Sequence, residues 1–286
     1  MENLLHVGLD VGSTTVKIVV MNENRNTIYR DYQRHFSDTK NTVCNVLENL
    51  ATRYPNSLLT IALTGSGAMS AAKFLDLPFI QEVVACKRAV EKYIPQTDVV
   101  IELGGEDAKI IYFDKSIEQR MNGTCAGGTG AFIDQMASLL HTDPTGLNEL
   151  AKKYEMIYPI ASRCGVFAKT DIQPLLNEGA AKEDIAASIF QAVVNQTISG
   201  LACGRPIRGH VAFLGGPLNY LSELRKRFIE TLKLTDEKII VPDEAHLLVA
   251  KGAALDSVNT NAITIEKLRS KIGVLKASHD DTSVPL

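Results

Sequence analysis

The chain opens with short segments that are densely apolar or that alternate apolar with polar residues, a pattern typical of β-strands. Residues 4–10 and 15–21 are two apolar runs on either side of a Gly-Ser-Thr turn, and residues 27–34 form a third run. A helical period covers 39–54, and another apolar run covers 58–63. This order predicts a β-hairpin, a third strand, a helix and a fourth, buried strand.

A similar pattern returns in the middle of the chain. Residues 98–103 and 108–113 are apolar runs around a Gly-Gly turn, and residues 116–121 can form a third strand. In both places a carboxylate ends the first strand, at Asp10 and at Glu102, and a glycine turn follows it. The pattern therefore predicts an internal repeat of one β-hairpin sheet.

The later half of the chain is mostly helical, interrupted by a buried strand over 210–214 and a short strand over 238–241. We expect an α/β protein of two lobes, each with a mixed sheet flanked by helices. The expected first lobe is 1–96 plus 245–258, and the second lobe is 97–244. Residues 259–286 are expected to be a tail or linker, with one amphipathic surface helix over 264–276.

Composition restricts the possible functions. The formal net charge is −3 among 286 residues, so the basic stripe that nucleic-acid binding requires is not expected. No apolar run approaches the ~20 residues that span a bilayer, and the N-terminus does not resemble a signal peptide. Five scattered cysteines suit a reducing compartment. We expect a cytoplasmic protein without nucleic-acid or membrane partners.

Three glycine turns form the candidate nucleotide site. In the first turn, Gly12 to Thr14, Gly12 permits close approach of the backbone, and Ser13 and Thr14 offer hydroxyls and amides to phosphate oxygens. Lys17 would add positive charge, and Asp10 would hold Mg²⁺ through water. Alone, this segment is equally compatible with an ordinary hairpin.

The second glycine turn, Gly104 to Asp107, and the third, Gly215 to Asn219, follow buried strands. We expect Gly104 and Gly105 to bind phosphate, while acidic residues manage Mg²⁺ and the attacking water. The catalytic candidates are Glu102, Glu106 and Asp107. The third turn is expected to border adenosine through Gly215, Gly216 and Asn219. The order of all three turns favours nucleotide binding over three unrelated turns.

Two cysteines precede helical patterns. Cys125 lies in Asn122–Gly130 and Cys164 lies in Ser162–Ala168. A thiolate at a helix N-terminus is stabilised by the helix dipole, which favours metal ligation. The same two cysteines could instead bind zinc, but the sequence offers no further His or Cys at the short spacing that zinc sites use. The other three cysteines lie on apolar faces and are expected in the core: Cys44, Cys86 and Cys203.

The order of the glycine turns and the final Ala/Gly-rich helix resembles the actin-like ATPase superfamily. The two cysteine segments narrow the resemblance to the ATP-dependent activators of 2-hydroxyacyl-CoA dehydratases and the ATPase subunits of benzoyl-CoA reductase. It covers about residues 4–258 and implies the two-lobed actin-like ATPase (ribonuclease H-like) fold, with a nucleotide cleft between the lobes. Compact activators usually carry Asp at the position of Glu102 and Gln at the position of Glu106.

This resemblance implies a homodimer with one shared [4Fe-4S] cluster, whose ligands here would be Cys125 and Cys164. It implies an ATPase that uses ATP, Mg²⁺ and the cluster to deliver a low-potential electron to a 2-hydroxyacyl-CoA dehydratase or related CoA-thioester reductase. Ferredoxin or flavodoxin would be the electron donor.

Two alternatives remain open from the residues. A small-molecule kinase of the same superfamily would use the glycine turns and would not need Cys125 or Cys164. A non-redox, ATP-gated interaction protein would use the cysteine helices only as a dimer interface.

Overall fold

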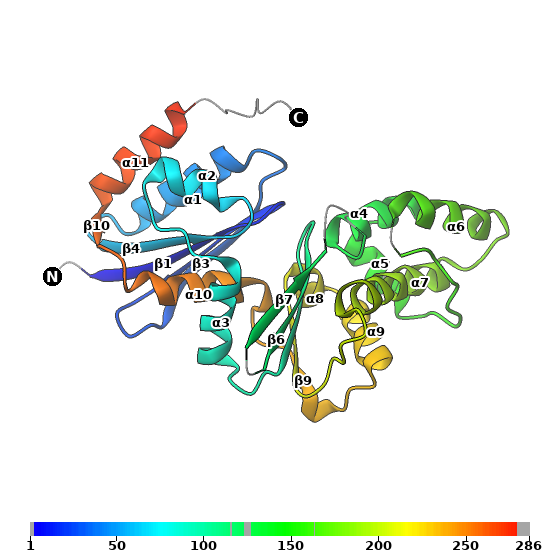
Figure 1. Ribbon diagram of the computed structural model, residues 1–286. Helices are drawn as coiled ribbons and strands as arrows, with labels where there is room; N and C mark the ends of the chain where they lie inside the picture. Colours follow the sequence, from blue (N-terminus) through cyan, green and yellow to red (C-terminus); the bar gives the residue numbers. More distant parts are fainter. Residues whose placement is uncertain (1–2, 115, 123–126, 163, 279–286) are drawn as a thin grey trace. The chain divides into compact units, whose positions relative to one another are not determined.

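The computed structural model describes residues 3–114, 116–122, 127–162 and 164–278. The chain forms two compact units: a first unit, Met1–Tyr93 with Leu247–Leu286, and a second unit, Ile94–His246. Each unit contains a five-stranded sheet with helices (Figure 1). Cys125 lies outside the described residues.

In the first unit the strand order is β10-β4-β1-β2-β3. The strands are β1 (Leu4–Val11), β2 (Thr15–Met21), β3 (Thr27–Arg34), β4 (Leu58–Thr64) and β10 (Ile263–Thr264). β1 pairs antiparallel with β2 and parallel with β4, so β1 lies at the centre of the sheet. The predicted hairpin and fourth strand are confirmed.

Both faces of this sheet are covered. Alternate residues of β2 point to opposite faces, so Val16, Ile18 and Val20 join one core while Val19 and Met21 join another. Figure 1 shows one face beneath α1 (Thr39–Arg53), α2 (Ala68–Leu75) and α11 (Ile265–Ala277), and the other against α10 (Leu248–Ser257). The helix α3 (Glu82–Tyr93) packs on α10. Burial on both faces explains the dense apolar runs.

Glycines let α10 approach its neighbours closely. A Cβ at Gly8 in β1 would lie 2.0 Å from the carbonyl oxygen of Ala250. A Cβ at Gly252 would lie 1.8 Å from the carbonyl oxygen of Ala85 in α3. The expected close packing of this Ala/Gly-rich helix is confirmed.

Gly252→Ala is therefore expected to destabilise the protein, because a methyl group here meets backbone that can yield only if α3 and α10 separate. The expected loss is about 1–3 kcal/mol of unfolding free energy. The matched control is Gly273→Ala in α11, where a Cβ meets nothing within 4 Å. That change should stabilise the protein by about 0.5–1 kcal/mol. Urea unfolding measures both; equal effects would contradict this packing.

The second unit repeats the arrangement with the order β7-β6-β5-β8-β9. Its strands are β5 (Val99–Leu103), β6 (Ala108–Phe113), β7 (Ile117–Met121), β8 (Val211–Leu214) and β9 (Ile239–Ile240). β5 pairs antiparallel with β6 and parallel with β8, as β1 does with β2 and β4. The internal repeat is thus confirmed at the level of topology. The edge strands differ, since β9 is parallel to β8 while β10 is antiparallel to β4.

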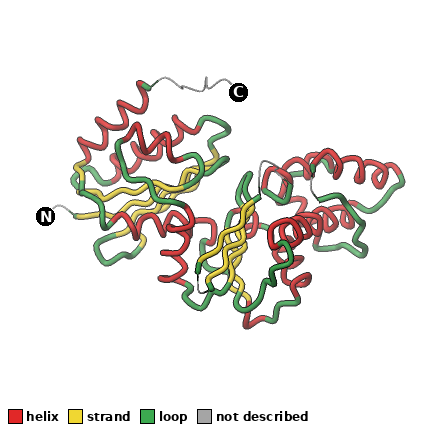
Figure 2. Tube along the Cα trace, in the orientation of Figure 1, coloured by secondary structure: helices red, strands yellow, loops and turns green. Residues whose placement is uncertain are grey.

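Helices pack with this second sheet around one apolar core (Figure 2). They are α4 (Gly130–Leu139), α5 (Pro144–Ala151), α6 (Gly165–Asn177), α7 (Lys182–Asn195), α8 (Gly216–Tyr220) and α9 (Ser222–Leu232). α7 continues into a π-helix, Gln196–Ala202. The segment Lys182–Ala202 is the one described helix long and apolar enough to cross a membrane, but 67% of its apolar window is buried in the protein.

Three details differ from expectation. The helix expected over 264–276 is confirmed as α11, but it and β10 belong to the first unit, where Ile265, Leu268 and Ile272 are buried, so residues 263–277 are not the expected surface tail. The expected helix over 218–232 is interrupted at Leu221, whose backbone is extended. Cys203 is exposed and left-handed (φ 44°) at the end of the π-helix, so its expected place in the core is wrong.

Candidate functional site

The first glycine turn connects β1 to β2 in the first unit. Asp10 is the next-to-last residue of β1, is 3% exposed and faces Lys17 across the hairpin. The Lys17 ammonium donates a hydrogen bond of 2.9 Å to Asp10 Oδ2. The N–H of Gly12 donates to the carbonyl of Thr15, which closes the turn and leaves Ser13 and Thr14 at its tip. Asp10, Gly12, Ser13, Thr14 and Lys17 thus form one group.

The turn after β4 lies against this group. Thr64 is opposite Asp10 in the parallel register, and its buried hydroxyl has no hydrogen-bond partner among the described residues. Gly65 has a φ of +102°, and a Cβ there would lie 2.5 Å from Asp10 Oδ1. The N–H of Gly67 donates to the carbonyl of Val11. Asp10 and Thr64 are therefore register partners near the ends of the two central strands, and their side-chain oxygens are of the kind that a hydrated cation prefers.

His35 contacts the first glycine turn, and the sequence alone did not predict this contact. It follows β3, is 6% exposed, and hydrogen-bonds the carbonyl of Gly12 through Nε2 at 3.2 Å. No spacing signal connects position 35 with position 12, since the pairing of β3 with β2 brings them together.

The second glycine turn connects β5 to β6 in the second unit. Glu102 is 7% exposed and faces Lys109 in the register, and its Oε2 has no hydrogen-bond partner among the described residues. The ammonium of Lys109 lies 4.0 Å from Asp107 Oδ2. Glu106 is exposed at the tip. The three acidic candidates are therefore close in the chain but differ in environment, and Glu102 is the buried one.

This turn is bonded to both ends of the first cysteine segment, Asn122–Gly130, and to Ala131. The carbonyls of Gly104 and Gly105 accept hydrogen bonds of 3.0 and 2.7 Å from the N–H groups of Gly130 and Ala131, at the start of α4. The side chain of Asn122 accepts from the N–H of Ala108 and donates to the carbonyl of Glu106. The turn is therefore tied by hydrogen bonds to Asn122 and to the start of α4.

The third glycine turn lies beside the second. Glu102 and Leu214 are partners in the parallel register of β5 and β8, so the two turns leave the same edge of the sheet. Gly215 has a φ of +88°, and a Cβ there would lie 2.0 Å from the carbonyl oxygen of Leu103. The carbonyl of Gly215 accepts from the N–H of Asn219, and Gly216 begins α8. Bare backbone at this edge is suited to a flat ring.

Cys164 is the described member of the cysteine pair. It is partly exposed and is the N-cap of α6, without a side-chain capping bond. A Cβ on the next residue, Gly165, would lie 2.3 Å from Oε1 of Gln135 in α4. The start of α6 therefore packs closely on α4, the helix that follows the other cysteine segment.

Gln196, at the start of the π-helix, touches both cysteine segments. A Cβ at Gly128 would lie 3.1 Å from Gln196 Cγ, and the hydroxyl of Ser162 donates to Gln196 Oε1 at 3.4 Å. Gly128 and Ser162 are far apart in sequence, but both lie next to the side chain of Gln196. π-Helical turns are frequent at functional sites.

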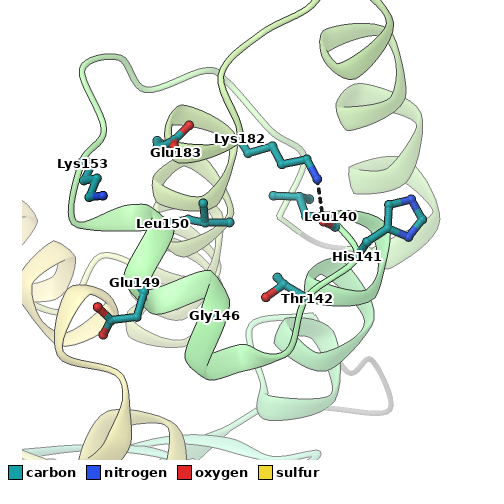
Figure 3. A pocket seen from close by; sticks show the side chains of 9 residues that line it. All are labelled: Leu140, His141, Thr142, Gly146, Glu149, Leu150, Lys153, Lys182 and Glu183. Atoms are coloured by element: carbon teal, nitrogen blue, oxygen red, sulfur yellow. Dashed lines mark hydrogen bonds between the residues drawn. The ribbon is translucent and has the colours of Figure 1, made fainter.

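Within the described ranges, no three His, Cys, Asp or Glu side chains come together as a metal site. A pocket of about 400 Å³ lies elsewhere in the second unit, between the α4–α5 turn, α5 and the start of α7 (Figure 3). There Lys182 Nζ donates to the carbonyl of Leu140 at 3.0 Å. The residues around this pocket include none of the candidates from the sequence.

The structure therefore gathers the candidates into two groups, one in each unit. The second-unit group consists of Glu102, Gly104, Gly105, Glu106 and Asp107 in the second turn and Gly215, Gly216 and Asn219 in the third. The first-unit group is the one around Asp10, to which Thr64 and His35 are added.

Several known proteins are similar to this chain in sequence and in fold. It is 31% identical over 256 residues to a 2-hydroxyisocaproyl-CoA dehydratase activator of Clostridioides difficile, an alignment that covers 87% of this chain and 93% of the activator. Component A of (R)-2-hydroxyglutaryl-CoA dehydratase from Acidaminococcus fermentans has a similar structure, with a TM-score of 0.77 at 27% identity. That likeness covers 93% of this chain and 99% of component A.

The solved structure of the Clostridium difficile activator with bound ADPNP has a TM-score of 0.75 at 26% identity, covering 96% of this chain and 98% of that one. The predicted actin-like ATPase fold and the predicted resemblance to dehydratase activators are therefore confirmed. The model of the BadF/BadG/BcrA/BcrD ATPase family matches residues 7–257. The chain belongs to that ATPase family.

Proposed function

We propose that this protein is a cytoplasmic, ATP-dependent electron-transfer activator of a 2-hydroxyacyl-CoA dehydratase or a related CoA-thioester reductase. The observation that carries the proposal is the bonding of the second glycine turn to Asn122, Gly130 and Ala131, around the first cysteine segment. It connects a candidate phosphate-binding turn to a candidate redox site. A kinase of the same superfamily would have no use for that connection.

ATP and Mg²⁺ are assigned to the glycine turns. In the first unit, Ser13, Thr14 and Lys17 bind phosphate oxygens, and Asp10 with the Thr64 hydroxyl holds the hydrated cation. In the second unit, Gly104 and Gly105 form the phosphate-binding turn with the N–H of Gly105 as the donor, since the N–H of Gly104 donates to the carbonyl of Asp107 and closes the turn. The third turn borders adenosine through Gly215, Gly216 and Asn219.

The hydrolytic role falls to the acidic residues of the second turn. Glu102 is buried with one carboxylate oxygen unpartnered among the described residues, so it can accept a hydrogen bond from a water molecule. Asp107 lies near the Lys109 ammonium, and Glu106 is exposed beside it. We assign Glu102 to orient the attacking water, with Glu106 and Asp107 completing the site.

A [4Fe-4S] cluster would be held by Cys125 and Cys164, two ligands from each chain of a homodimer, because a cubane cluster takes four thiolates. Such a cluster supplies a low-potential, one-electron carrier. The described residues fit this group: Cys164 is partly exposed at a helix N-terminus, where the dipole stabilises a thiolate. Gln196 touches the segments next to both cysteines.

The chain's own part in coupling is mechanical. When the second turn closes on a triphosphate, the N–H groups of Gly130 and Ala131 follow their acceptors, and the start of α4 moves with them. Because α4 packs on the start of α6 through Gln135, both helices respond. The dehydratase is the partner that accepts the electron and leaves reduced. Ferredoxin or flavodoxin then supplies the next electron to the activator.

Anaerobic purification tests the proposal. We expect about four iron and four sulfide per dimer and a visible absorption that bleaches with dithionite. A colourless protein that takes up no iron, even after anaerobic reconstitution, would overturn the redox assignment and favour the kinase.

A further inference from the structure

We propose that His35 is a positioning residue for the first glycine turn, holding its carbonyls so that the turn can receive a phosphate. The inference rests on the proposed binding of ATP to that turn. His35 engages the turn twice: its backbone N–H donates to the carbonyl of Thr14 at 3.1 Å, and its ring bonds the carbonyl of Gly12 at 3.2 Å. The His35 side chain is buried, which limits the access of water to the ring bond.

The bonding pattern fixes the tautomer of the ring. A carbonyl oxygen can only accept, so Nε2 must carry the hydrogen that points to Gly12. The N–H of Ser37 donates to Nδ1 at 3.1 Å, so Nδ1 must be bare. His35 is therefore a neutral ring with one donor and one acceptor, and each is used.

The backbone next to His35 adopts an unfavourable conformation to keep the ring there. Phe36 and Ser37 have φ values of 46° and 68°, and the N–H of Asp38 closes a four-residue turn on the carbonyl of His35 at 2.7 Å. Two successive positive φ values are typical of type I′ turns, which favour glycine and asparagine. Phe36 is 81% exposed, so burial of its ring does not explain the strain. Such outliers persist where the surroundings over-determine them, often at functional sites.

The consequence concerns phosphate. Carbonyl oxygens carry negative partial charge and repel an anion, whereas amide N–H groups attract it. The two bonds from His35 hold the carbonyls of Gly12 and Thr14, one on each side of Ser13. The turn is thereby fixed before the nucleotide arrives, which lowers the cost of ordering it on binding.

Two substitutions separate the two ring nitrogens. In His35→Gln the amide NH₂ can occupy the place of Nε2 and donate to the carbonyl of Gly12. In His35→Asn the side chain is shorter, so its amide oxygen replaces the acceptor Nδ1 and no donor reaches Gly12. We expect His35→Asn to raise the KM for ATP about tenfold with kcat little changed, which corresponds to losing one hydrogen bond. His35→Gln should stay within about twofold of the unmodified protein, since its donor remains.

Ser37→Gly is the matched control, because glycine accepts the positive φ and keeps the backbone N–H that bonds Nδ1. It should raise the melting temperature and leave the KM for ATP unchanged. Equal KM values for His35→Asn and His35→Gln would overturn the inference. If either variant fails to fold, nitrogen NMR of the ring in the unmodified protein decides: a hydrogen on Nδ1 overturns it. Failure of the unmodified protein to bind ATP would instead overturn the proposed function, and this inference with it.

Discussion

Cys164→Ala is expected to abolish iron binding while ATP hydrolysis continues. Removing one thiolate per chain removes two of the four ligands of a cluster shared by two chains, and two ligands do not hold a cubane cluster. The thiol makes no side-chain capping bond to α6, so alanine should leave that helix intact. We expect iron to fall from about four per dimer to near zero, with the ATPase rate within about twofold. Iron analysis and phosphate release measure the two quantities separately.

The control for this experiment is Cys203→Ala. Cys203 belongs to the same unit and is exposed, and its thiol donates to the carbonyl of Gly200. It has no place in the proposed ligand set, so Cys203→Ala should keep its iron. A Cys164→Ala protein that retains iron, or a Cys203→Ala protein that loses it, would show that the ligands are assigned incorrectly.

Asp10→Asn is expected to lower kcat/KM for ATP hydrolysis by about 10²–10³-fold, because a neutral amide cannot balance the charge of Mg²⁺ at the end of β1. The same change leaves the Lys17 ammonium without its carboxylate in a largely buried position, which also threatens folding. The double variant with Lys17→Met removes that stranded charge. It should recover stability without recovering turnover.

Asp76→Asn provides the comparison for a carboxylate in the same unit. Asp76 is ion-paired with Lys271 at 2.8 Å but is 94% exposed, and its φ of 47° suits asparagine. Its replacement should change neither turnover nor the midpoint of urea unfolding. Wild-type turnover in Asp10→Asn would contradict the assignment of Asp10 to the cation.

Much of this fold was predictable because its central strands are apolar on both faces. The run over β1 and β2 is dense rather than alternating, since Val16, Ile18 and Val20 bury on one side and Val19 and Met21 on the other. The repeat was also predictable, because Asp10 and Glu102 each lie next to the last residue of a central strand, shortly before a glycine turn. Local sequence carried these features.

Other features depend on contacts between distant segments. The role of residues 263–277 was missed because β10 is only two residues long and α11 buries a narrow apolar stripe against α1 and α2. The break at Leu221 has no glycine or proline to announce it.

The candidate site was predictable only in part, for the same reason. The glycine turns could be found individually, but the contacts of His35 and Thr64 follow from strand pairing. The bonding of Gly104 and Gly105 to α4 also joins segments separated in sequence. Gln196 gave no sequence signal at all, since it is one polar residue in a long helix and its two contacts come from other loops.

The most direct test of ATP-dependent electron delivery mixes the dithionite-reduced protein, freed of excess reductant, with a 2-hydroxyacyl-CoA dehydratase under anaerobic conditions. Absorbance follows reoxidation with ATP and Mg²⁺, with a non-hydrolysable ATP analogue, and without nucleotide. We predict that reoxidation and dehydratase activity develop together and require hydrolysable ATP. Equal reoxidation in all three mixtures, or ATP hydrolysis with no change in the reduced protein, would contradict the proposed function.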